Sequence, residues 1–192
     1  MNQIELVAAL LGLVNVVLTV RRSVLNYPFG IAMVSLYFFI FVDVRLYSDA
    51  LLQLFFLVIQ LYGWWNWSRS SRAAGGVAVD RLPAATRLWW LLGTLAGSLA
   101  WGLAMARFTD AAAPYIDAMV AGFSISAQSL LALRKVESWA LWIAVDVVAV
   151  GLFLSRGLAV TAALYCLFLA LAVSGLIAWS RRLPPVAAAV AE

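Results

Sequence analysis

A carboxylate and two aromatic rings recur at helical spacing inside a strongly apolar stretch. Trp139, Trp142 and Asp146 stand at positions i, i+3 and i+7, so a helix places all three on one face. A carboxylate is costly in hydrocarbon, and Asp146 is therefore expected to face a bundle interior or a watery cavity. Aromatic faces beside a carboxylate suit a flat organic cation. The structural alternative places Trp139 in an interfacial belt and Trp142 in packing, with Asp146 hydrogen-bonded to a neighbouring helix.

The residue types that the chain lacks exclude many other kinds of site. It contains no histidine, one cysteine (Cys166) and one lysine (Lys135). Histidine-ligated haem, histidine-based metal sites, Ser-His-Asp catalysis and disulfide frameworks therefore lack their residues. Lys135 lies between Arg134 and Glu137 at an expected helix end, which disfavours a retinal Schiff base. We predict that the protein is not an enzyme and has no metal or cofactor site.

The composition is that of a protein built from membrane-spanning helices. Of the 192 residues, 66% are hydrophobic and 11% are charged, which lies outside the range of soluble globular domains. The net charge of +4 comes from arginines dispersed between apolar runs, so no nucleic-acid partner is expected. Runs suited to crossing a bilayer lie near residues 4–20, 27–44, 49–67, 87–106, 116–133, 139–155 and 158–179. The sequence predicts an all-α integral membrane protein with seven transmembrane helices.

Basic residues are distributed unequally between the two ends of these predicted helices. One end holds Arg21, Arg22, Arg69, Arg72, Arg81, Arg87, Arg134, Lys135, Arg181 and Arg182, and the other holds Arg45, Arg107 and Arg156. The more basic end is expected to be cytoplasmic, which places the N-terminus outside and the C-terminus inside. Residues 68–86 are expected to form a cytoplasmic linker, and residues 184–192 a short cytoplasmic tail.

The two ends of the chain carry an internal repeat. A shift of 112 residues aligns identical residues without a gap: Arg22 with Arg134, Gly63 with Gly175, and Trp67-Ser68-Arg69 with Trp179-Ser180-Arg181. We predict a 3+1+3 parallel repeat, with three helices in residues 1–68, a linker and fourth helix in 69–110, and three helices in 111–183. Transporters built this way bind substrate between the repeats near mid-membrane. The alternative is a duplication that serves only as scaffold.

Two further helical faces carry candidate side chains at the spacing i, i+7 and i+11: Gln53, Gln60 and Trp64 in one span, and Asp117, Ser124 and Gln128 in another. Gln60 and Gln128 lie roughly 16 Å below the outer ends of their helices, and Asp146 roughly 10 Å above the inner end of its own. The repeat gives these three the apolar counterparts Ala172, Val16 and Val34. Polar residues needed only to join the triplets would recur in both copies, so this asymmetry favours an asymmetric ligand. Tyr165 is a further candidate, although a lone tyrosine is more often a bond between helices.

Several short motifs resemble those of a known transporter family. They are Asn26-Tyr27-Pro28-Phe29-Gly30, Leu46-Tyr47, Leu51-Leu52-Gln53, Tyr62-Gly63-Trp64-Trp65-Asn66-Trp67, and Arg134-Lys135-Val136-Glu137-Ser138-Trp139 with Trp142. Together they span essentially residues 4–182 and resemble the Pnu-type vitamin transporters. The resemblance implies a heptahelical fold related to the SWEET sugar transporters and a homotrimer in the bacterial inner membrane. It also implies facilitated diffusion, made one-way when the nucleoside is phosphorylated in the cytoplasm.

Two positions depart from the family pattern and bear on the substrate. Ser138 stands where the family usually has asparagine, and Asp146 stands where many members carry asparagine. A carboxylate in place of an amide favours a cationic ligand, and nicotinamide riboside and thiamine both carry a cationic ring. We expect uptake of nicotinamide riboside, with thiamine, riboflavin or a deoxynucleoside as alternatives. A lipid-modifying membrane enzyme using Asp117 and Asp146, or a scaffold subunit, is the alternative of another class.

The expected site lies between the triplets at mid-membrane. The substrate ring would stack on Trp142 and Trp139, its polar groups would meet glutamines, and Asp146 would complement its charge. The expected substrate-binding residues are Gln53, Gln60, Trp64, Asp117, Ser124, Gln128, Trp139, Trp142, Asp146 and Tyr165.

Overall fold

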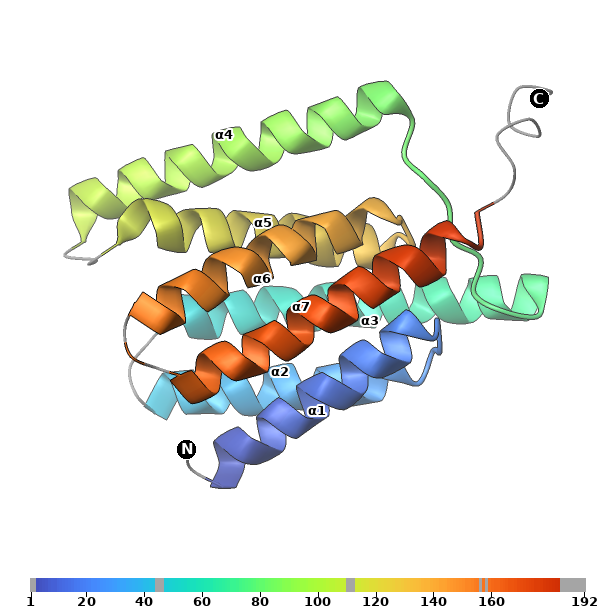
Figure 1. Cartoon of the computed structure of the whole chain (residues 1–192), viewed down its shortest axis with the longest axis horizontal. Helices are drawn as coiled ribbons and strands as arrows, with labels where there is room; N and C mark the ends of the chain where they lie inside the picture. Colours follow the sequence, from blue (N-terminus) through green and yellow to red (C-terminus); the bar gives the residue numbers. More distant parts are fainter. Residues whose placement is uncertain (1–2, 44–46, 110–112, 156, 158, 184–192) are drawn as a thin grey trace.

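The computed structural model describes residues 3–43, 47–109, 113–155, 157 and 159–183. These residues form α1 (Gln3–Val20), α2 (Asn26–Asp43), α3 (Tyr47–Ala74), α4 (Ala84–Phe108), α5 (Pro114–Ala132), α6 (Glu137–Ser155) and α7 (Ala159–Ser180). Consecutive helices run in opposite directions (Figure 1). The ends of α1, α3, α5 and α7 therefore gather with the starts of α2, α4 and α6. We call this the basic end, because Arg22, Arg69, Arg134 and Arg182 lie there.

Six of the helices form a closed ring. Each of α1, α2, α3, α5, α6 and α7 packs against the next in that order, and α7 returns to α1. Among the described helices, α4 packs only on α5 and lies outside the ring (Figure 1). The first triplet, α1 to α3, therefore meets the second triplet, α5 to α7, along the α3/α5 and α1/α7 seams.

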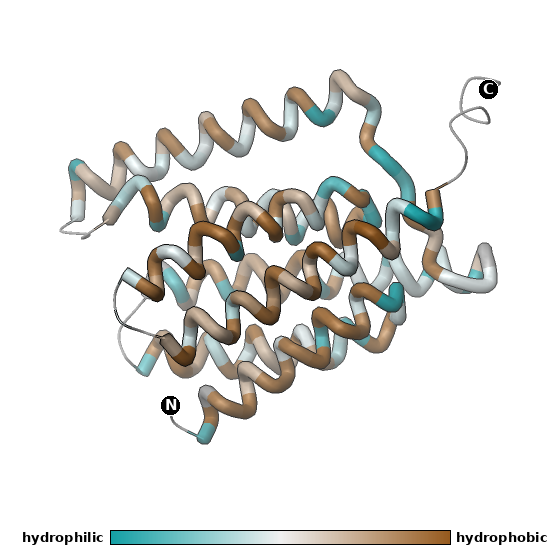
Figure 2. The backbone as a smooth tube through the Cα atoms, in the orientation of Figure 1, coloured by the Kyte–Doolittle hydropathy of each residue, from teal (hydrophilic) through white to brown (hydrophobic). Residues whose placement is uncertain are grey.

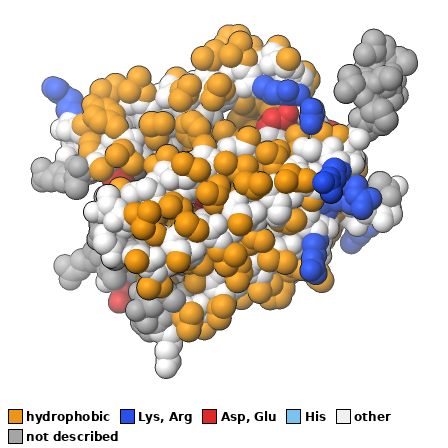
Figure 3. Space-filling model, in the orientation of Figure 1, with side chains coloured by type: hydrophobic (Ala, Val, Ile, Leu, Met, Phe, Trp, Pro, Cys, Tyr) orange, Lys and Arg blue, Asp and Glu red, His pale blue; other side chains and the backbone are white. Residues whose placement is uncertain are grey.

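The surface of the bundle matches a hydrocarbon environment. Helices α2, α4, α5, α6 and α7 are long and apolar enough to cross a membrane, while α1 contains a shorter apolar stretch, Leu6–Val20. Polar residues such as Gln53 and Gln60 lower the hydrophobicity of the long helix α3. Trp89 is 71% exposed and Val160 is 78% exposed. Residues of high hydropathy recur along the helices (Figure 2), and hydrophobic side chains cover much of the visible face (Figure 3). Such an extensive apolar surface is stable in lipid rather than in water.

Helix α4 packs on α5 through small residues. Thr94, Ser98 and Gly102 form its buried side. The Thr94 hydroxyl lies 2.7 Å from the Ser126 hydroxyl in a buried hydrogen bond, and the Ser98 hydroxyl lies directly over Gly122. Small residues let two helix backbones approach closely, which is the usual way that membrane helices associate.

Two helix ends that lie 112 residues apart have the same left-handed geometry. Arg22, after α1, has a φ of 55°, and Arg134, after α5, has a φ of 63°. In both turns the next amide donates to a carbonyl five residues earlier at 2.9 Å, from Ser23 to Leu18 and from Lys135 to Leu130. A non-glycine residue in this region costs roughly 1 to 2 kcal/mol. The presence of arginine at both positions therefore indicates that the two side chains make interactions that offset this cost.

Two buried tryptophans join the triplets at the basic end. The indole of Trp67 donates to the Leu131 carbonyl at 3.1 Å, and the indole of Trp179 donates to the Thr19 carbonyl at 3.3 Å. Trp67 and Thr19 belong to the first triplet, and each donor lies 112 residues from its equivalent, as does each acceptor. The ring centroids of Trp67 and Trp179 are 5.6 Å apart. Trp67 and Trp179 therefore form one contact that spans both seams, which we call the closure.

Close packing of rings on glycines supports these tryptophans. Tyr27 covers Gly63, and Trp139 covers Gly175. A Cβ atom at Gly63 would lie 2.5 Å from the Tyr27 hydroxyl oxygen, and one at Gly175 would lie 2.6 Å from the Trp139 ring. Trp139 also meets Trp179 edge to face at 5.4 Å between centroids. Glycine is needed at both positions because a side chain would occupy the space of the ring.

The connection between α3 and α4 is shorter than the predicted residues 68–86. Helix α3 continues to Ala74, and α4 begins at Ala84. Residues 68–74 contain neither glycine nor proline, so nothing interrupts the helix when it leaves the apolar region. It ends before Gly75, whose φ is 66°, in the manner of a glycine that caps a helix.

The linker that follows is packed across the basic end. Val77 and Val79 are buried in the same hydrophobic cluster as Trp67 and Trp179. The Arg22 guanidinium of the first triplet donates to the Val77 carbonyl at 2.8 Å. On the second triplet, the Lys135 ammonium bonds to the Asp80 carboxylate at 2.8 Å. The linker therefore contacts both triplets and covers the closure.

Candidate functional site

Asp146 lies in the interior, and no described residue pairs with it as an opposite charge. Its residue exposure is 5%, and it comes from α6. The Tyr165 hydroxyl of α7 lies within electrostatic range of both Asp146 and Tyr37 of α2. No hydrogen bond or salt bridge joins Asp146 to another described residue. The alternative in which Asp146 serves as a hydrogen-bonded link between helices therefore finds no bond within the described part of the chain.

Gln60 is the second polar side chain of the interior. It is 4% exposed, and its amide packs directly against Gly30 of α2, beside the amide nitrogen of Asn15 from α1. Asn15 is fixed by a hydrogen bond of 2.8 Å to the Asn26 carbonyl. A side chain at Gly30 would collide with the Gln60 amide oxygen. Gly30 therefore makes the space in which two amides meet.

The second triplet has a large aromatic residue where the first has glycine, and small apolar residues where the first has amides. A shift of 112 residues takes Gly30 to Trp142 and takes Asn15 and Gln60 to Ala127 and Ala172. Both alanines are buried, and Trp142 packs against the hydrophobic cluster that contains Ala172. The first triplet thus has a glycine and two amide side chains at these positions, whereas the second has a tryptophan and two alanines. These three positions are accordingly polar or small in the first triplet and apolar in the second.

The other predicted residues lie at different depths and exposures. Gln53 and Gln128 are half-buried, and Ser124 is buried. Trp64 is 39% exposed. Asp117 is exposed in the first turn of α5, within electrostatic range of Asp49. Trp64 and Asp117 are therefore more exposed than Asp146 and Gln60, which are buried.

Trp139 belongs to the closure at the basic end. It is 2% exposed, it covers Gly175, and its indole nitrogen has no hydrogen-bond partner in the described structure. Its depth follows from the start of α6 at Glu137, which puts Trp139 in the first turn and Trp142 about one turn further into the membrane.

The sequence did not single out Gly30 as part of the site. A glycine in an apolar helix carries no chemical signal, and its role depends on which side chains face it. The repeat supplied a usable signal, because Gly30 is the counterpart of Trp142. A position that is glycine in one copy and tryptophan in the other marks a large change in interior volume.

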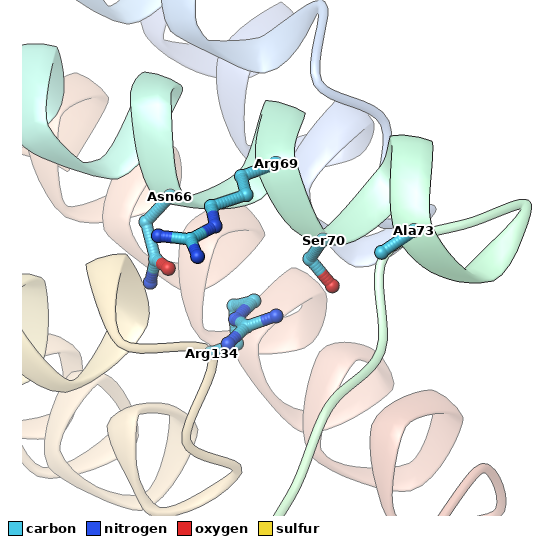
Figure 4. A pocket seen from close by; sticks show the side chains of 5 residues that line it. All are labelled: Asn66, Arg69, Ser70, Ala73 and Arg134. Carbon is cyan, nitrogen blue, oxygen red and sulfur yellow. The ribbon is translucent and has the colours of Figure 1, made fainter.

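Two cavities open at the basic end. One has a volume of about 330 Å³ and is lined by Asn66, Arg69, Ser70, Ala73 and Arg134 (Figure 4). The other, about 430 Å³, is lined by Trp65, Ser68, Arg69, Arg72 and Ala73. Within the described residues, no three His, Cys, Asp or Glu side chains come together as metal ligands.

Comparison with known proteins gives a consistent set of relatives. Residues 2–181 match the model of a family described as nicotinamide mononucleotide transporter. The chain is 27% identical over 204 residues to the nicotinamide riboside transporter PnuC of Escherichia coli (strain K12), covering 93% of this chain and 85% of that protein. It is 29% identical over 178 residues to the riboflavin/roseoflavin transporter RibM of Streptomyces davaonensis, covering 91% and 83%.

A solved structure shares the fold. The crystal structure of the vitamin B3 transporter PnuC superimposes with a TM-score of 0.74 at 28% sequence identity. The match covers 91% of this chain and 79% of the other. Agreement over this length shows that the helices described above are arranged as in that transporter.

Proposed function

Because the chain belongs to the family described as nicotinamide mononucleotide transporter, we propose that this multi-pass membrane protein takes up nicotinamide riboside, the cargo named for its PnuC relative. It is a transporter and not an enzyme. The observation that carries the choice of cargo is the buried carboxylate of Asp146, which has no counter-charge among the described residues. The pyridinium ring of nicotinamide riboside supplies that charge.

The Asp146 carboxylate also favours binding of nicotinamide riboside over nicotinamide mononucleotide. A phosphate group beside Asp146 would add a second negative charge to a poorly solvated interior, and like charges there repel strongly. Every lysine and arginine that the structure describes lies near a helix end or in a connection, so none of these described cations stands beside Asp146 to neutralise a phosphate. A neutral ribose hydroxyl meets no such penalty.

In the proposed site the cargo lies between the two triplets. Its ring stacks on Trp142, and its charge is balanced by Asp146. The amides of Gln60 and Gln128 are available to its carboxamide and ribose, and Tyr165 borders the carboxylate. Gln53, Trp64, Asp117, Ser124 and Trp139 stay predictions at the edge of this group. The matched control for stacking is Trp90, a half-buried tryptophan on α4 outside the ring.

The proposed architecture is a 3+1+3 repeat of seven membrane spans, related to the SWEET transporters and assembled as a homotrimer. The matching turns at Arg22 and Arg134, together with the reciprocal bonds of Trp67 and Trp179, support the repeat. Its units are residues 1–68, 69–110 and 111–183, with 184–192 as a cytoplasmic tail. The basic end faces the cytoplasm of a bacterial cell, which leaves the N-terminus outside.

Transport then follows from rocking of the two triplets about the site. The α3/α5 and α1/α7 seams are where the triplets meet, so alternate opening of the seams exposes the cargo to one side at a time. The movement is facilitated diffusion, and phosphorylation in the cytoplasm traps the cargo. A closed basic end, held by Trp67 and Trp179, is one of the two limiting positions of such a cycle.

Riboflavin is the second candidate cargo, because the RibM relative is named for it. Its ring system is neutral, so Asp146 offers it no charge complementarity. Thiamine also carries a cationic ring, so charge does not distinguish it from nicotinamide riboside.

The decisive experiment is thermal unfolding of the purified protein against nicotinamide riboside, nicotinamide mononucleotide, thiamine, riboflavin, a deoxynucleoside and glucose. A ligand that binds only the folded state stabilises it by about 2.7 kcal/mol at a hundredfold excess over its dissociation constant. We expect a rise in unfolding temperature with nicotinamide riboside and none with the mononucleotide. A rise with riboflavin alone would move the assignment to the second candidate, and no rise with any compound would refute the vitamin cargo.

A further inference from the structure

Two guanidinium groups line one cavity at the basic end. It lies between α3 and the turn after α5, with a volume of about 330 Å³ and a lining that includes Arg69, Ser70 and Arg134 (Figure 4). The described lining residues include no acidic side chain. The two salt bridges of the described structure join Arg87 to Glu137 and Lys135 to Asp80, so they leave both cavity arginines unneutralised.

Arg134 carries a buried donor without an acceptor. Its Nε atom is shielded from solvent and has no hydrogen-bond partner among the described residues. Leaving a buried donor unpaired costs about 1 to 3 kcal/mol. A guanidinium group in this state is best satisfied by an oxyanion, because its donors match the oxygen spacing of carboxylate and phosphate.

At the equivalent position of the first triplet, the arginine does have a hydrogen-bond acceptor. Arg22 occupies the position that corresponds to Arg134, and its guanidinium donates to the Val77 carbonyl at 2.8 Å. Both residues keep the unfavourable left-handed backbone, but the linker supplies a carbonyl to Arg22, whereas no described carbonyl bonds to the Arg134 side chain. The cavity beside Arg134 therefore lacks the oxygen that its counterpart has.

We propose that this cavity binds a phosphoryl oxyanion, held by Arg69 and Arg134 and by the Ser70 hydroxyl. The Ser70 oxygen already accepts the Ala78 amide at 3.2 Å, so its own proton is available to donate. Arg69 is held over the Trp65 ring, with 5.7 Å from its guanidinium carbon to the ring centroid. The oxyanion belongs either to a soluble phosphate ester or to the headgroup of an anionic phospholipid. This site goes beyond the proposed transport function and does not depend on it.

The first arm of the test is thermal unfolding of the full chain in detergent, titrated with sodium phosphate against sodium chloride at equal ionic strength. We expect phosphate to raise the unfolding temperature. Arg69→Gln and Arg134→Gln should each weaken the apparent affinity by about tenfold, since each removes a charged donor. The control is Arg81→Gln, because Arg81 is an exposed linker arginine outside the cavity. If Arg134→Gln does not fold, Arg69→Gln decides the outcome.

The second arm identifies a lipid source. The same proteins are reconstituted in nanodiscs of phosphatidylglycerol or phosphatidylcholine, and the lipid retained after extraction is measured by native mass spectrometry. Selective retention of phosphatidylglycerol by the wild type and Arg81→Gln, with loss from the cavity variants, assigns the oxyanion to a headgroup. A phosphate response in the first arm without lipid selectivity assigns it to a soluble ester. The proposal fails if neither arm responds, or if both cavity variants behave as the wild type does.

Discussion

Asp146 is the buried ionisable residue on which the proposed choice of cargo depends. It is 5% exposed and lies near the Tyr165 hydroxyl, with no cation beside it among the described residues. An unpaired carboxylate destabilises the empty bundle, and a cationic ligand relieves that cost. The residue therefore links folding stability to cargo charge.

Replacing Asp146 by asparagine tests this link in two directions. We expect Asp146→Asn to raise the unfolding temperature of the empty protein, because a buried charge is removed. The dissociation constant for nicotinamide riboside should rise roughly tenfold, as expected for the loss of one charged interaction. Calorimetric titration with riboflavin provides the neutral control. A larger loss of riboflavin binding than of nicotinamide riboside binding would refute the charge argument.

Trp142 supplies the aromatic surface of the proposed site. Trp142→Ala should weaken binding of nicotinamide riboside by about 0.5 to 2 kcal/mol, the range for a cation stacked on a ring. Trp142→Phe keeps a ring and should recover part of the loss. Trp90→Ala on α4 is the matched control, since that tryptophan lies outside the ring of helices. Equal losses of affinity for Trp142→Ala and Trp90→Ala, measured by calorimetry, would exclude the stacking assignment.

The helices are positioned by close contacts that tolerate little change. Trp139 lies on Gly175 with no room for a methyl group between them, since a Cβ atom there would lie 2.6 Å from the ring. The backbone of α7 therefore approaches α6 as closely as the ring allows. This contact sets the depth at which the following turn of α6 presents Trp142 to the interior.

Gly175→Ala should therefore destabilise the bundle by about 1 to 3 kcal/mol, the usual cost of overpacking. The matched control is Gly151→Ala, because Gly151 lies on α6 with open space where a Cβ atom would go. That variant should be neutral or slightly stabilising, since alanine favours a helix. Unfolding temperatures of the two variants in the same detergent measure the difference. Equal stability of the two variants would show that the α6/α7 contact is not tight.

At the scale of the whole molecule, the basic end is expected to face the cytoplasm. The test uses cysteine labelling in a Cys166→Ala background, because Cys166 is the one native cysteine. Ala78→Cys places an exposed thiol in the linker, and Thr109→Cys places one at the opposite end after α4. A membrane-impermeant maleimide added to intact cells should label only the Thr109→Cys variant. Labelling of Ala78→Cys alone would invert the orientation.

The helices could be predicted from the sequence because membrane spans are read from length and apolar content. Predicted spans such as 139–155 match α6, which covers Glu137–Ser155. The prediction for residues 68–74 was wrong, since polar composition suggested a linker while the backbone, free of glycine and proline until Gly75, continued as a helix. Composition reports where a chain leaves the membrane rather than where a helix ends.

The interior could be predicted only in part. Asp146 and Gln60 were identified because a polar residue in an apolar span is costly and therefore conspicuous, and both are buried. Trp139 has the same residue type and face as Trp142, and its packing against Gly175 and Trp179 distinguishes its environment. The role of Gly30 and the lack of an acceptor for Arg134 depend on neighbours from distant helices, which no local pattern encodes.

The reciprocal bonds of Trp67 and Trp179 have a consequence for genetics. Each indole holds one seam, so a single conservative change such as Trp67→Phe leaves the other bond in place. The two bonds join different seams, and the linker also contacts both triplets at this end. A point mutation that removes one indole hydrogen bond therefore leaves the second one in place. A screen for permanently open alleles should therefore recover paired changes at these two codons more often than single conservative changes.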